Sequence, residues 1–115
     1  MNSVEVLLAA KELLNDPKCW TKGTVARNAN GGAVAPNNTD AVCWCAVGAL
    51  AKICKYPFNP TLYETVIYAF ENVSSRQNGI GYWNDDKDRT HEEVLNAFDR
   101  AIFEESKRIK NETAV

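Results

Sequence analysis

Histidine and closely paired cysteines are scarce in this sequence, and their scarcity argues against a metal site. The chain has one histidine, His91, and its four cysteines form no Cys-x-x-Cys pair. A structural zinc ion needs four converging Cys or His ligands, which usually come from such pairs. The two nearest cysteines, Cys43 and Cys45, would point about 200° apart on a helix and could not share one ion. We therefore expect no metal and no cofactor, and we interpret the thiols as small buried apolar groups.

The sequence also lacks an excess of positive charge, a long apolar run and a leader. Thirteen basic residues stand against fifteen acidic ones, for a net charge of −2, whereas nucleic-acid binders usually present a basic face. A membrane helix needs about 20 apolar residues, and the uncharged run at residues 41–51 is shorter. Residues 1–6 have neither the basic region nor the apolar core of a signal peptide. We therefore expect a cytoplasmic protein with reduced thiols and with no nucleic-acid or membrane partner.

The uncharged run at residues 41–51 is the most informative stretch that the sequence does contain. Apart from Gly48, every member is apolar. A helix that is apolar on all sides is usually buried on all sides, so we predict a central buried helix from about residue 41 to residue 54. The chain has 115 residues, which is the size of one domain, and we expect a single domain over residues 1–115.

Capping signals indicate the other helices. Asn2 with Glu5, and Thr90 with Glu93, have the spacing of capping boxes. Asn59-Pro60 combines an N-cap with a first-turn proline. Apolar residues at helical spacing follow each signal, so we predict a helix after each one.

Glycine-rich and polar segments separate these helices. Asn30-Gly31 suits a tight hairpin turn, so we predict a short β-hairpin from residues 24–27 and 33–35. Residues 74–89 show no periodicity and are predicted to form a loop, and the polar residues from about 106 are expected to fray. The predicted fold is mainly α, with about four helices packed around a central buried helix and a short β-hairpin between helices one and two.

The predicted loop and one cation supply the candidate ligand-binding residues. Loops held by rigid helices often carry binding groups, and the candidates are Arg27, Trp83, Asn84, Asp85 and Arg89. The aspartates of this loop lack the glycine and the final glutamate of a calcium loop. A structural interpretation is also open: Trp83 anchors the loop, Asn84 and Asp85 satisfy backbone amides, and Arg27 is a solvated or internally paired charge.

A catalytic cysteine is a second hypothesis. Cys43 lies in the first turn of the predicted central helix, where the helix dipole favours a thiolate. His91 begins the last predicted helix, so the two would pair if the helix starts meet, with Asn84 or Asp85 as the orienting group. Such a pair suits acyl transfer or hydrolysis. A chain with four cysteines and one histidine also allows such a pair by accident.

Two motifs stand out in combination. The first is Trp44-Cys45-Ala46-Val47-Gly48-Ala49, and the second is Trp83-Asn84-Asp85 followed by Arg89-Thr90 and Val94. Together they resemble a family of small bacteriophage and bacterial proteins of unknown function, over about residues 11–102. The resemblance implies no activity. It implies instead that Trp44, Cys45 and Gly48 allow close helix packing and that Thr90 fixes a helix start. The cysteine of the family motif is Cys45, and neither Cys43 nor His91 is a motif position.

These observations favour a non-enzymatic binding module. By analogy with the family, we expect a small phage-derived or bacterial accessory protein that binds a host protein or a small ligand, in the host cytoplasm if phage-encoded. The alternative is a cysteine-dependent hydrolase or transferase that uses Cys43 and His91. The acidic balance of charge disfavours a DNA-binding regulator.

Overall fold

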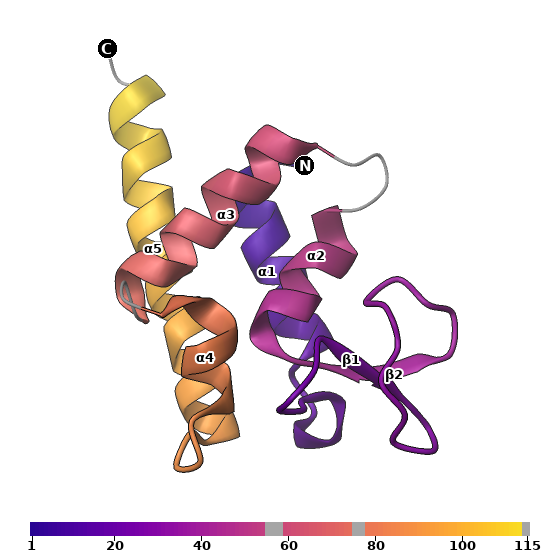
Figure 1. Cartoon of the computed structure of the whole chain (residues 1–115). Helices are drawn as coiled ribbons and strands as arrows, with labels where there is room; N and C mark the ends of the chain where they lie inside the picture. The colour runs from indigo at the N-terminus through magenta and orange to yellow at the C-terminus, as the bar shows by residue number, and fades with distance from the viewer. Residues whose placement is uncertain (55–58, 75–77, 114–115) are drawn as a thin grey trace.

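The computed structural model describes residues 1–54, 59–74 and 78–113, and these form five α-helices, one short 3-10 helix and a two-stranded antiparallel sheet (Figure 1). In chain order the elements are α1 (Ser3–Leu13), the 3-10 helix η1 (Pro17–Cys19), β1 (Ala26–Asn28), β2 (Ala41–Trp44), α2 (Ala46–Cys54), α3 (Pro60–Val73), α4 (Gly79–Asp85) and α5 (His91–Thr113). The sheet lies beside the start of α2, and α5 runs to the far end of the molecule. The fold is therefore mainly helical, as predicted.

The capping signals in the sequence are confirmed. The Asn2 side chain accepts a hydrogen bond from the Glu5 amide, and the Glu5 carboxylate accepts one from the Asn2 amide, at 2.9 Å each. Asn59 caps α3 by accepting from the Leu62 amide at 3.1 Å. Each cap satisfies amides that have no partner inside the helix, which is why these helix starts could be read from a few neighbouring residues.

The predicted start of the central helix is wrong. Ala41–Trp44 form strand β2, and helix α2 begins only at Ala46. A short apolar run without periodicity does not by itself distinguish a buried helix from a strand. Here β1 pairs with one edge of this segment, and Trp20 forms a parallel bridge at Trp44. These partners supply hydrogen bonds to an extended backbone. Helix α2 packs against α1, α3 and α4.

The predicted hairpin has a turn at the right place, of another type than predicted, and the wrong second strand. Ala26 pairs with Trp44 and Arg27 with Cys43 in the antiparallel sheet, whereas residues 33–35 contribute only an isolated bridge between Ala33 and Arg27. The turn closes when the Gly31 amide donates to the Asn28 carbonyl at 2.9 Å. A two-residue turn at Asn30-Gly31 needs positive φ at both residues, but only Gly31 has it, at +82°. Positive φ suits glycine, which has no Cβ.

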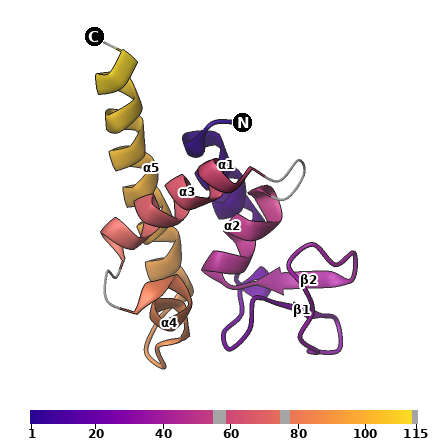
Figure 2. The same ribbon diagram turned by 45° about the horizontal axis from the view of Figure 1, so that its top comes forward.

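Two segments are more helical than predicted. Part of the expected loop at residues 74–89 forms α4, and residues 75–77 of that loop lie outside the described residues. Where the sequence predicts fraying from about residue 106, α5 instead continues to Thr113. Figure 2 shows this end of α5 extending away from the sheet and from α4.

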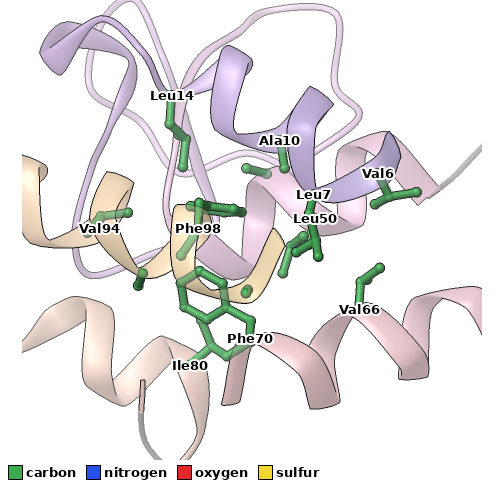
Figure 3. Close-up of a cluster of buried hydrophobic side chains, with 14 of the residues drawn as sticks. Val6, Leu7, Ala10, Leu14, Leu50, Val66, Phe70, Ile80, Val94 and Phe98 are labelled. Atoms are coloured by element: carbon green, nitrogen blue, oxygen red, sulfur yellow. The ribbon is translucent and has the colours of Figure 1, made fainter. Parts of the chain in front are cut away.

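The core lies between α1, α2, α3 and α5 (Figure 3). Phe70 of α3 and Phe98 of α5 are fully buried, with ring centroids 4.7 Å apart at an interplanar angle of 61°. Leu7 of α1 and Leu50 of α2 are also fully buried and lie close together in Figure 3. Edge-to-face aromatic contacts add to the stability that apolar burial supplies. This core fixes the helices that carry the candidate site.

Candidate functional site

A buried asparagine on α4 joins three separate segments of the chain. Asn84 has no exposed surface, and its Oδ1 accepts hydrogen bonds from Trp20 Nε1 at 2.7 Å and from the Ala46 amide at 3.0 Å. Ala46 is the first residue of α2, so a side chain 38 residues later in the sequence satisfies an amide at this helix start. A buried polar group is stable only with such partners.

The other half of the Asn84 amide is equally occupied. Nδ2 donates to the Thr21 carbonyl at 3.1 Å and to Asp85 Oδ1 at 3.0 Å. The same Asp85 oxygen accepts from the amide of Gly23 at 2.9 Å. A carboxamide has two acceptor lone pairs and two donor hydrogens, so the in-chain partners use all of its capacity.

Arg27 reaches the same backbone segment from β1. Its guanidinium donates from Nε to Thr21 Oγ1 at 2.9 Å and from one terminal nitrogen to the Lys22 carbonyl at 2.8 Å. The other terminal nitrogen donates to the Gly31 carbonyl at 3.1 Å. The planar fork of arginine suits several fixed acceptors at once. We name Thr21, Gly23, Arg27, Asn84 and Asp85 the Asn84 cluster.

The structure therefore brings three predicted candidates to one segment, and it gives each of them internal partners. Trp83 and Arg89 form a separate pair: the Arg89 guanidinium lies 4.1 Å from the centre of the Trp83 ring, and its Nε donates to the Trp83 carbonyl at 3.0 Å. Trp83 also meets Phe70 edge-on, with centroids 5.6 Å apart. Arg89 and Trp83 thus fasten the end of α4 to the core and to Glu93, which lies 3.4 Å from Arg89.

The premise of the cysteine-enzyme hypothesis is wrong, because Cys43 does not lie at a helix start. It lies on β2 opposite Arg27 and not in the first turn of a helix, because α2 begins at Ala46. His91 Nε2 lies 2.6 Å from the Leu14 carbonyl oxygen, and its ring lies 6.1 Å from the Trp20 ring. Leu14 and Trp20 are therefore described neighbours of His91.

The Trp-Cys-x-x-Gly motif sits where β1 crosses the start of α2. A Cβ at Gly48 would lie 1.9 Å from the Val25 carbonyl oxygen, and that oxygen accepts from the Cys45 amide at 3.2 Å. Cys45 is buried, and burial raises the pKa of its thiol, so it is a poor nucleophile. The Trp44 indole donates to the Pro36 carbonyl at 2.9 Å.

Thr90 caps α5. Its amide donates to the Glu93 carboxylate at 2.9 Å, and the Glu93 amide donates back to Thr90 Oγ1 at 3.1 Å. This reciprocal pair is the capping box that the spacing predicts. The hydrogen bond from the Thr90 amide is the main cause of a lowered pKa for Glu93.

A hollow lies elsewhere, between α3 and α5. It is an open groove of about 690 Å³, lined by Thr61, Glu64, Thr65, Tyr68, Ala69, Asn72, Glu104, Glu105 and Arg108. A second hollow shares Asn72 and Glu104 with it and extends it to Arg100 and Phe103. We name the two together the α3–α5 groove. Tyr68 is 67% exposed and Phe103 62%.

Sequence reasoning missed this groove, although a signal was present. Tyr68 and Phe103 are large aromatic residues that fall outside the apolar stripes of their helices. An aromatic side chain on the wet face of a helix has no role in the core. Two such residues on neighbouring helices indicate a surface rather than packing.

Comparison with known proteins places the chain in a family. The model of DUF6197, described as a family of unknown function, matches residues 1–104. The chain belongs to the DUF6197 family. The match includes the whole Asn84 cluster and ends at Glu104, so Glu105 and Arg108 of the groove wall lie beyond the matched residues of this DUF6197 chain. Neither a curated protein nor a solved structure matches the chain.

The described part of this DUF6197 protein has neither a cluster of metal ligands nor a membrane-spanning helix. Within residues 1–54, 59–74 and 78–113 there is no group of three or more His, Cys, Asp or Glu side chains that could hold a metal ion. Over the same ranges, no helix combines the length and the apolar character needed to cross a membrane.

Proposed function

We propose that this protein is a non-enzymatic binding module that recognises another protein through the α3–α5 groove. One contrast carries the proposal. In the Asn84 cluster, the amide of Asn84 and all three guanidinium nitrogens of Arg27 have partners within the chain. At the groove, Tyr68 and Phe103 are mostly exposed. Exposed aromatic side chains beside a hollow are typical of binding surfaces.

The shape of the groove favours a protein over a small ligand. Small-molecule sites usually bury most of the ligand's surface, whereas this groove is open along its length. Helix α3 has 14 residues, which corresponds to about 21 Å of helix. That length suits a helical segment laid between α3 and α5, with its apolar side against Tyr68, Ala69 and Phe103.

The charges at the groove favour basic residues on the partner. Glu64 and Glu104 line it as exposed carboxylates, and Glu104 lies 3.5 Å from Lys107. The two arginines of the groove have partners within the chain, because Arg108 pairs with Glu105 and Glu112 and Arg100 donates to the Val73 carbonyl at 3.0 Å. Complementary charge fixes orientation and speeds association, so we expect lysine or arginine flanking the apolar residues of the partner.

The setting of this module is part of the same proposal. The paired Trp-Cys-x-x-Gly-Ala and Trp-Asn-Asp motifs support a phage-derived or bacterial accessory protein that acts on a host protein in the cytoplasm. Net charge supports a partner other than nucleic acid.

Comparative affinity capture tests the proposal. The wild type and the double variant Tyr68→Glu/Phe103→Glu are each used to capture proteins from cells of the encoding organism. Tyr82→Glu is the matched control, because Tyr82 is 69% exposed on α4, outside the groove. We expect a protein retained by the wild type and by Tyr82→Glu and lost with the double variant. Equal retention of that protein by all three baits would contradict binding at the groove, provided that circular dichroism shows the double variant to be folded.

A further inference from the structure

Two cysteines from different segments each precede a residue that is bridged at β2. Trp20 forms a parallel bridge with Trp44, and the Thr21 amide donates to the Trp44 carbonyl at 3.0 Å. Cys19 comes directly before Trp20, and Cys43 comes directly before Trp44. The bridge therefore brings the backbones of Cys19 and Cys43 near each other, and a disulfide needs a Cα separation of about 4.4–6.8 Å.

The exposure of the four cysteines separates this pair from the other two. Cys19 and Cys43 are both partly exposed, whereas Cys45 and Cys54 are buried. Cys19 ends η1, and this short helix packs against β2. The pKa of the Cys19 thiol is raised first by burial, then by Asp16 and by Cys43. The influence of Cys43 on Cys19 agrees with the adjacency that the bridge indicates.

We propose that Cys19 and Cys43 are a modification site, at which a hydroperoxide oxidises the pair to an intrachain disulfide. One thiolate attacks the peroxide oxygen, the O–O bond breaks, and a sulfenic acid forms while the released hydroxide takes a proton to become water. The second thiolate then attacks the sulfenic sulfur and forms the S–S bond as the S–O bond breaks, and the displaced hydroxide takes the proton that this thiol released and becomes a second water. Two electrons pass from the two thiols to the peroxide, and a dithiol reductant reverses the reaction.

The disulfide would fasten the backbone on which the Asn84 cluster depends. It closes a ring from Cys19 to Cys43 that contains β1 and the turn at residues 28–32. The ring also contains Thr21 and Gly23, which bind Asn84 and Asp85. A cross-link of this kind reduces the freedom of the unfolded chain. We therefore expect the oxidised form to melt at a higher temperature than the reduced form.

Mass spectrometry after peroxide treatment tests the site. The reduced full-length protein is exposed to hydrogen peroxide, blocked with N-ethylmaleimide and digested. We expect a mass loss of about 2 Da from the removal of two hydrogens, a linked peptide joining Cys19 to Cys43, a raised Tm, and reversal by dithiothreitol. Cys19→Ser and Cys43→Ser should each abolish the loss, and Cys54→Ser should keep it.

Other products would overturn the proposal. An intermolecular disulfide, a sulfinic acid on Cys43 with Cys19 still free, or no oxidation at a peroxide excess that oxidises free dithiols would each show that the pair does not join. The reduced serine variants are checked by their melting curves. If one fails to fold, peptide mapping of the peroxide-treated wild type decides the question, because only the intrachain disulfide gives a monomer with a peptide that joins Cys19 to Cys43 and that dithiothreitol separates.

Discussion

The indole nitrogen of Trp20 donates a 2.7 Å hydrogen bond to the side-chain oxygen of Asn84, 64 residues away in the sequence. That oxygen also accepts from the amide of Ala46 at the start of α2. One buried carboxamide therefore ties the segment after η1 to α2 and to α4. The first predictions concern the stability that this arrangement supplies.

Asn84→Ala should lower the free energy of unfolding by about 3 kcal/mol. The change leaves the Trp20 indole, the Ala46 amide and the Thr21 carbonyl without their partner, and each unsatisfied buried group costs about 1–3 kcal/mol before water compensates. Denaturant unfolding at pH 7 measures the loss. Asn96→Ala, at an exposed position of α5, is the control and should change stability by less than about 0.5 kcal/mol. Equal stabilities would show that the cluster contributes nothing.

Gly48→Ala should destabilise the protein by about 3 kcal/mol or prevent folding. The new methyl group would lie 1.9 Å from the Val25 carbonyl oxygen, so the backbone at Val25, just before β1, would have to move away from α2. Gly81→Ala is the matched control on α4, because no atom lies within 4 Å of a Cβ there. It should raise stability by about 0.5–1 kcal/mol, since alanine is the better helix former. Thermal melts of both variants show whether each substitution lowers or raises the stability.

The elements that the sequence predicts well depend on neighbouring residues. The capping box of Asn2 with Glu5 and the cap at Asn59-Pro60 each lie within a few positions of the helix start they fix. Local hydrogen bonds of this kind are the same in any fold. The structure accordingly has these helix starts where the sequence predicts them.

The elements that the sequence mispredicts depend on distant partners. Ala41–Trp44 are extended because Trp20 and β1 flank them, and neither partner is visible in the run itself. Helix α4 contains two glycines, an asparagine and an aspartate, all weak helix formers. Its Ile80 and Asn84 are buried by contacts from far along the chain. Tertiary contacts override local preference in both cases.

The candidate site shows the same division. The types of Arg27, Asn84 and Asp85 marked them as polar groups that would converge, and they do meet at Thr21–Gly23. The hydrogen bonds that these side chains make could not be predicted from the sequence, because they depend on which backbone groups need partners once the chain has folded.

Stability should fall in mild acid through Glu105. Hydrogen bonds from Arg108 lower the pKa of this carboxyl group, burial opposes them, and the Ser3 hydroxyl, 2.6 Å away, lowers it further. A carboxyl group with a lowered pKa stabilises the fold above its unfolded pKa, and that contribution is lost as the pH falls through the lower folded pKa.

Glu105→Gln should remove part of this pH dependence and cost about 2 kcal/mol at pH 7, as expected for hydrogen bonds to a charged group. Urea unfolding at several pH values measures both effects. Glu104→Gln, at the exposed neighbouring position, should cost less than about 0.5 kcal/mol at pH 7. An unchanged acid slope in Glu105→Gln would contradict the assignment.

Thiol labelling should separate the four cysteines by burial. In native protein, iodoacetamide should modify Cys19 and Cys43 before Cys45 and Cys54, because the first two are partly exposed. Cys43 should react no faster than free glutathione at neutral pH, since it lies on β2 and not in the first turn of a helix. The measurement is peptide mapping of a labelling time course. If Cys43 reacts faster than glutathione and this faster labelling is lost in His91→Ala, the result would support the hypothesis of a cysteine-dependent enzyme.

Site-specific photocrosslinking tests the central claim most directly. A photoreactive phenylalanine replaces Tyr68 in the α3–α5 groove, Tyr82 on α4, or Ala29 in the turn after β1 in three separate proteins, each illuminated in the cells that encode it. The account predicts a covalent adduct with one partner protein from position 68 and none from positions 82 and 29. Adducts from position 29, with none from position 68, would contradict it and would place binding at the turn after β1.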